Sequence, residues 1–143
     1  MSVTITVAVE VDGKLFAAGA SDYIVQGLER TVRDIVDLGE QRLDEMLRPR
    51  PAGVYLSFSE AKKGKYSTGR YRKNLHAKSK GLHGRIDDGG VIYGPWLEGT
   101  SSRNQTTRFK GYSSFRKTAQ LMQEKAPEIL TQHMNWAVAK LES

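Results

Sequence analysis

The sequence contains no cysteine among its 143 residues. Disulfide bonds and thiolate metal sites are therefore excluded, and the composition fits a reducing compartment. No apolar run reaches the roughly 18 residues that a membrane-spanning helix needs, so we expect no membrane association. The N-terminal residues 1 to 6 alternate polar and apolar types without a charged leader, so a secretory signal is not expected either.

Motifs of known catalytic chemistry are also missing. The chain has no Gly-rich phosphate loop, no Gly-x-Ser-x-Gly elbow and no pair of histidines on one helix face. His76, His83 and His133 are well separated and lack metal-type spacing with a carboxylate. Asp87 and Asp88 have the chemistry of an acid–base pair, but adjacent carboxylates before Gly-Gly are more typical of a turn. We therefore predict a non-enzyme that binds no metal or cofactor.

Acidic residues are absent from one long stretch, residues 61 to 86, although the chain as a whole carries a formal charge of +6. Tyrosines and a histidine interleaved with the cations suit stacking and phosphate contact with single-stranded nucleic acid. Lysines on an exposed sheet edge, where they prevent pairing with the strands of other molecules, would give the same pattern. No base-reading motif is present, so non-specific contact with a phosphate backbone is the form of binding that we consider. The cations are Lys62, Lys63, Lys65, Arg70, Arg72, Lys73, Lys78, Lys80 and Arg85.

Two long amphipathic helices are predicted. In residues 22 to 47 apolar side chains recur at three- and four-residue steps, with charged residues on the other side. Gly27 and Gly39 disfavour a helix interior, so we expect close packing contacts there. A second helical pattern begins at Phe115 and reaches Leu141, and Pro127 must kink or restart it.

Strands are predicted from alternating patterns. Residues 3 to 11 form a period-two strand, and Asp12-Gly13 then favours a hairpin turn into a short return over residues 14 to 17. Residues 54 to 58 are also typical of a strand. Residues 70 to 86 fit an extended strand or one that starts with a helical turn, broken by Gly81 and Gly84. The remaining expectations are a turn at residues 87 to 90, a loop at residues 101 to 111 and a single domain over residues 1 to 143.

The stretch from Val91 to Thr100 joins the basic segment to the second helix. Gly94-Pro95 interrupts the hydrogen-bond pattern of any β-strand, because proline lacks an amide hydrogen. Trp96 and Leu97 either plug the core from a turn or anchor an interface, where tryptophan is enriched. Glu98 would lie near the arginines of the following loop or of a neighbouring subunit. The interface candidates are Trp96, Leu97, Glu98, Arg103 and Arg108.

The order of these features resembles the head–tail joining, or tail-completion, proteins of long-tailed bacteriophages. The resemblance rests on short motifs in a fixed order and covers about residues 22 to 141. Residues 3 to 11 precede the first helix, and Gly111-Tyr112 stands where the family pattern has a proline, so tail completion, tail termination and another neck ring stay open. The matching segments are the helix from Asp22 to Leu47, Thr68-Gly69-Arg70 with the following Tyr71 to Leu75, Tyr93 with Leu97 to Thr100, and Phe115 to Ala119 and onward.

The resemblance implies an α+β fold, with a small antiparallel or mixed sheet packed against both long helices and preceded by the hairpin. It also implies a hexameric ring in the virion neck, assembled in the host cytoplasm, between head connector or adaptor proteins and the tail tube or its terminator. The lumen of such a ring passes DNA, and we expect Lys62, Lys63 and Lys65 either to face it or to dock onto an acidic ring. From another class, a small basic nucleic-acid-binding module remains the alternative.

Overall fold

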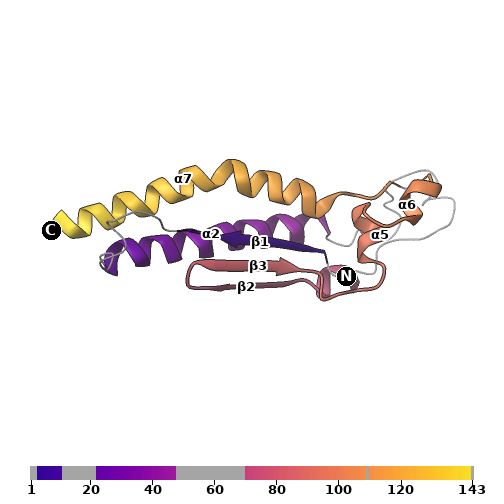
Figure 1. Ribbon diagram of the computed structural model, residues 1–143, viewed down its shortest axis with the longest axis horizontal. Helices are drawn as coiled ribbons and strands as arrows, with labels where there is room; N and C mark the ends of the chain where they lie inside the picture. Colours follow the sequence, from indigo (N-terminus) through magenta and orange to yellow (C-terminus); the bar gives the residue numbers. More distant parts are fainter. Residues whose placement is uncertain (1–2, 11–21, 48–69, 109, 143) are drawn as a thin grey trace.

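The computed structural model describes residues 3–10, 22–47, 70–108 and 110–142. Two long helices lie side by side and antiparallel, and a sheet covers one side of the pair (Figure 1). The α+β prediction is confirmed, because a three-stranded antiparallel sheet, which includes the N-terminal strand, packs against the long helices α2 and α7. The elements are β1 (Thr4–Ala8), α2 (Asp22–Met46), α4 (Arg70–Lys73), β2 (His76–Lys80), β3 (His83–Asp87), α5 (Gly94–Glu98), α6 (Arg103–Thr106) and α7 (Ser114–Glu142).

The two predicted helices are α2 and α7, and both begin and end close to the expected residues. α7 continues through Pro127 rather than restarting there, and it is bowed along its length (Figure 1). The predicted glycine contacts also occur. A methyl group on Gly39 would meet Met122 of α7, and one on Gly27 would meet Met134 of the same helix. These glycines let α2 and α7 approach closely.

The sheet has the order β1-β3-β2, and all pairs are antiparallel. Residues 3 to 11 were predicted to contain a strand, and β1 confirms it. The predicted return at residues 14 to 17 lies outside the described residues, as does the predicted strand at residues 54 to 58. β1 pairs with β3, in the register that places Ile5 opposite Ile86.

The segment from Arg70 to Ile86 combines the two alternatives, since a helical turn, α4, precedes β2. Gly81 begins the turn between β2 and β3, as expected of a strand breaker. The prediction for Gly84 was wrong, because this residue lies inside β3. A side chain at Gly84 would meet Val36 of α2, so glycine is needed there for close packing of the strand on the helix.

The core lies between α2, α7 and β3. Its fully buried members are aliphatic or aromatic, and burial of such side chains is the main stabilising term of a small domain. Partly buried residues of β1 pack against this core. No helix in the described part of the chain has the length and hydropathy of a membrane span. The core residues are Val32, Ile35, Val36, Leu43, Ile86, Phe115 and Met122.

Candidate functional site

The predicted turn at residues 87 to 90 is built around a buried carboxylate. Asp88 has no exposed surface, and its oxygens accept hydrogen bonds from the Val3 amide, the Gly90 amide and the Tyr71 hydroxyl at 3.0 to 3.2 Å. A buried carboxylate needs such donors, because leaving it unpaired is costly. Asp88 thus fastens the start of β1, α4 and the turn to one another. Its role is structural, which agrees with the turn interpretation.

Tyr71 is the side-chain donor to this carboxylate. Burial of the ring, the negative charge of Asp88 and the hydrogen bond to Asp88 all raise the pKa of the phenol above its ordinary value. The hydroxyl therefore stays protonated and can only donate to Asp88. The Tyr71 ring also lies 5.9 Å from the ring of Tyr93. These contacts connect α4 to the residue that precedes α5.

Glu98 caps the N-terminus of α7. This side chain is 7% exposed, and its two oxygens accept hydrogen bonds from the amides of Phe115 and Arg116, each at 2.9 Å. The first amides of a helix lack partners within it, and the helix dipole favours a negative charge there. Glu98 therefore joins α5 to the start of α7 across a long sequence separation. The sequence showed an acidic residue in a turn but not the helix that it caps.

Trp96 and the following loop are also connected. The Asn104 side chain is 4% exposed, and it donates a hydrogen bond of 3.0 Å to the carbonyl of Trp96. The Arg103 guanidinium lies 5.6 Å from the centre of the Trp96 ring, within the range of a cation–π contact. The predicted loop at residues 101 to 111 therefore contains a helical turn, α6, that packs on α5. Asn104 was not among the predicted residues, since nothing in its local pattern distinguishes it.

The predicted interface residues thus gather at one end of the molecule, where α5 and α6 lie beyond the start of α7 (Figure 1). Leu97 joins them through its carbonyl, which accepts a hydrogen bond of 2.7 Å from the amide of Tyr112. Arg108 is exposed. Trp96 and Glu98 order the segment that follows them, and whether this end also contacts a neighbouring subunit stays a prediction. Lys62, Lys63 and Lys65 lie outside the described residues.

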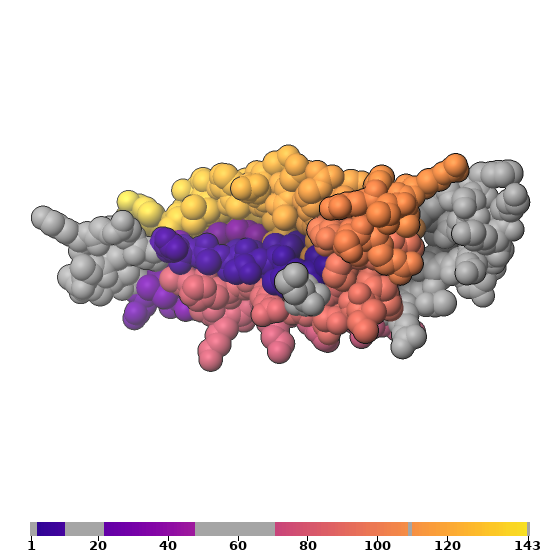
Figure 2. All heavy atoms as spheres, turned by 45° about the vertical axis from the view of Figure 1, so that its right-hand side comes forward, coloured from indigo at the N-terminus to yellow at the C-terminus, as the bar shows by residue number. Residues whose placement is uncertain are grey.

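A second candidate surface is the outer face of the sheet. The register places Lys78 opposite Arg85 and Lys80 opposite His83, and all of these residues are exposed. Lys78 and Arg85 are like charges directly opposite each other across two strands, which is unfavourable, so this pair does not serve the stability of the sheet. Neither lysine forms an ion pair within the part of the chain that the structure describes. In Figure 2, long side chains from this part of the chain project away from the body of the molecule.

Asp87 is an acidic residue on this face. Its Oδ2 lies 3.3 Å from Nε of Arg85, and its Oδ1 lies 3.4 Å from the ring of His76. Partial burial opposes ionisation of Asp87, but the Gly89 amide, His76 and Arg85 outweigh it and lower the pKa of the carboxyl. Asp87 is thus ionised and neutralised locally. Asp87 therefore does not offset the charges of Lys78 and Lys80.

The described residues do not bring three or more histidine and carboxylate side chains together in a cluster suited to a metal ion. His133 instead bridges the two long helices, with its Nε2 at 2.6 Å from Oδ2 of Asp34. Comparison of the chain with protein-family models, with curated proteins and with solved structures finds no match. The function of the candidate sites is therefore argued from their geometry alone.

Proposed function

We propose that this protein is a structural subunit that assembles into a ring in the neck of a long-tailed bacteriophage, where it joins the head connector to the tail tube. The observation that carries the proposal is the cationic outer face of the sheet. Lys78, Lys80 and Arg85 project from it, while both long helices lie on the opposite side. A ring whose lumen passes DNA needs a surface that tolerates the phosphate backbone, and exposed cations supply it.

Self-assembly is proposed from the order of the sequence motifs that resemble those of head–tail joining proteins. Ile92 is 97% exposed on the connection between β3 and α5, but a single exposed apolar side chain is normal on a protein surface and does not distinguish a ring subunit from a monomer. A monomeric basic nucleic-acid-binding module would explain the cationic face equally well. Tail termination is the neighbouring role within the same structural class.

Mass and DNA binding together test the proposal. Sedimentation of the purified chain should give a species several times the monomer mass of 16.0 kDa, or the chain should copurify with tails. Duplex DNA should bind weakly and non-specifically, with an affinity that falls as salt rises. A strictly monomeric protein that binds DNA tightly would contradict the joining function and favour the binding module.

A charge-reversal pair locates the surface that meets DNA. Lys78→Glu with Lys80→Glu should weaken duplex binding at low salt and lower the salt slope by about 2, roughly one for each lysine that no longer neutralises a phosphate. Lys117→Glu with Lys125→Glu on α7 is the matched control, because both lysines are exposed and the net charge changes equally. Equal weakening by the two double variants would show that only net charge matters and would remove the sheet face from the proposal.

A further inference from the structure

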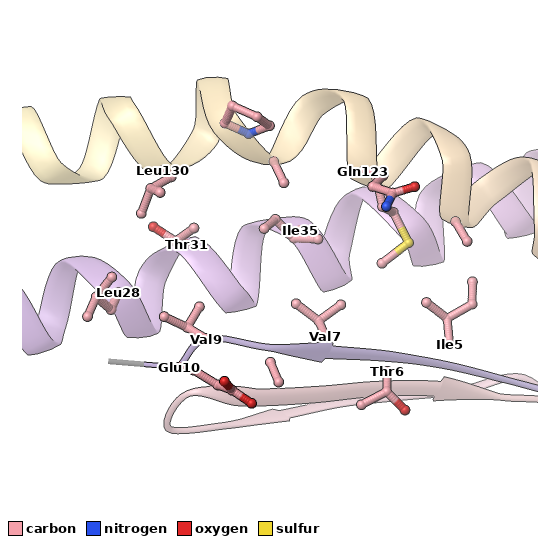
Figure 3. Close-up of a pocket in the computed structure, with 15 residues that line it drawn as sticks. Ile5, Thr6, Val7, Val9, Glu10, Leu28, Thr31, Ile35, Gln123 and Leu130 are labelled. Atoms are coloured by element: carbon pink, nitrogen blue, oxygen red, sulfur yellow. The ribbon is translucent and has the colours of Figure 1, made fainter. Parts of the chain in front are cut away.

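The outer face of the sheet is a small grid of side chains whose members are fixed by the strand register. In Figure 3, Val7 and Val9 point from β1 toward the helices, where they line an apolar groove between β1 and α7, whereas Thr6 and Glu10 point away from them. The Val9 amide donates to the Leu82 carbonyl, so the pairing of β1 with the segment of β3 continues as far as Glu10. The outward positions form three rows, namely Thr4, Asp87 and His76, then Thr6, Arg85 and Lys78, then Ala8, His83 and Lys80.

The charge of this face depends on its two histidines. With both imidazoles neutral, three cations stand against two carboxylates, which leaves a formal charge of +1. Protonation of both histidines raises it to +3. Histidine is the side chain that changes its charge between about pH 5 and 8, so a small fall in pH triples the charge of the face. The cations are Lys78, Lys80 and Arg85, the carboxylates are Glu10 and Asp87, and the histidines are His76 and His83.

His83 is surrounded mainly by cations. Lys80 lies directly opposite it on β2, and Arg85 follows two residues along β3 on the same face. Its diagonal neighbours are Lys78 on β2 and Glu10 on β1, at the roughly 7–8 Å that separate such positions. The lysine directly opposite opposes a positive charge on His83. An anion bound at this row would remove that opposition, so anion binding and protonation of His83 favour each other.

His76 acts through a shared carboxylate. Asp87 lies opposite it and places Oδ1 at 3.4 Å from the His76 ring and Oδ2 at 3.3 Å from Nε of Arg85. Neutral His76 leaves Arg85 alone to balance this negative charge. Protonated His76 balances it instead, and the guanidinium of Arg85 then has charge available for an external anion. Arg85 lies between Lys78 and Thr6 in its row, and guanidinium, ammonium and hydroxyl groups are all donors that contact phosphates.

We propose that the outer face of the sheet binds the phosphate backbone of DNA in a proton-dependent way, with His76 and His83 taking up protons as phosphates bind. The inference rests on the DNA contact in the proposed function and says how that contact is regulated. Protonation and phosphate binding are reciprocally coupled, because each makes the other more favourable. Binding therefore strengthens as pH falls through the histidine range. Above that range the face keeps only its formal charge of +1 and binds weakly.

Titration of the full chain with duplex DNA at several pH values tests the coupling. At fixed low salt the affinity should rise roughly tenfold from about pH 8 to about pH 6, and the salt slope should steepen by about 2, one for each histidine that neutralises a phosphate. Calorimetry at about pH 6.5, in two buffers with different heats of ionisation, should show that binding takes up protons. His76→Gln with His83→Gln should remove most of the pH dependence and the proton uptake.

His133→Gln is the matched control for His83→Gln. His133 is the third histidine of the chain, and it lies away from the sheet face, beside Asp34 between α2 and α7. Its removal changes the net charge at low pH as much as removal of His83 does. Circular dichroism checks that both variants are folded. Equal loss of pH dependence in the two single variants would show that only net charge matters and would overturn the proposal.

The remaining outcomes separate the coupling from the proposed function. If the protein binds duplex DNA equally well at about pH 8 and about pH 6, the coupling is wrong while the DNA contact stands. If it binds no DNA at low salt at either pH, the DNA contact fails and the coupling falls with it. If the chain is strictly monomeric but its binding shows the pH dependence that the double variant loses, the coupling stands and the ring does not.

Discussion

The middle of the molecule and its α5–α6 end are stabilised by different interactions. In the middle, α2, α7 and β3 bury aliphatic side chains against one another. At the α5–α6 end the buried groups are polar, namely Asp88, Glu98 and Asn104, and each is hydrogen-bonded to a backbone group of another segment. Apolar burial tolerates small shifts, whereas a buried carboxylate requires its donors at fixed positions. The middle therefore provides stability, and the end provides a fixed arrangement of turns.

The largest effect is expected from the middle. Ile86→Ala should lower the free energy of unfolding by about 2–5 kcal/mol, because it removes a fully buried side chain and leaves a cavity. Ile92→Ala is the control, since this isoleucine lies outside the core and its removal should cost less than about 0.5 kcal/mol. Urea denaturation measures both. Similar costs at the two positions would show that Ile86 is not part of a packed core.

An intermediate effect is expected at the polar end. Glu98→Ala should lower the free energy of unfolding by about 1–2 kcal/mol, because the Phe115 and Arg116 amides lose their acceptor. Hydrogen exchange of these two amides should accelerate more than exchange in the middle of α7. Glu124→Ala, at an exposed position of α7, is the control. Unchanged protection at the first turn of α7 would contradict the capping role.

The smallest expected effect is a pH dependence of the folding stability, caused by Asp87, which lies between the two regions. The folded state lowers the pKa of Asp87, so the unfolded chain binds the proton more tightly than the folded one. The resulting stabilisation is present above the ordinary aspartate pKa of 3.8 and is lost as pH falls through the lower folded value. Asp87→Asn should therefore flatten the decline of stability with acid, relative to Asp37→Asn on the exposed side of α2. Identical acid profiles for both variants would remove this role.

The same contrast explains how much could be predicted. Helix α2 was predictable because its apolar residues repeat with the helical period. They therefore form one face of the helix, and that face is the buried one. The turn at residues 87 to 90 was predictable because Asp-Gly chemistry acts locally. The partner of β1 was not predictable, since pairing with β3 joins residues about eighty positions apart, as the bond between the Val3 amide and Asp88 shows. Nor did the pattern of α7 distinguish buried Met122 from the partly exposed Leu130.

Local sequence patterns were enough to predict the two amphipathic helices, the alternating first strand, the glycine contacts and the concentration of positive charge. These features follow from the hydrophobic period, the composition and the backbone preferences of each residue. All three depend only on residues that are close together in the sequence. Three features became visible only in the fold: Glu98 caps a helix, Lys78 and Arg85 face each other across two strands, and a groove lies between β1 and α7. The physical reason is distance along the chain, because each of these features depends on which remote segments come together in space.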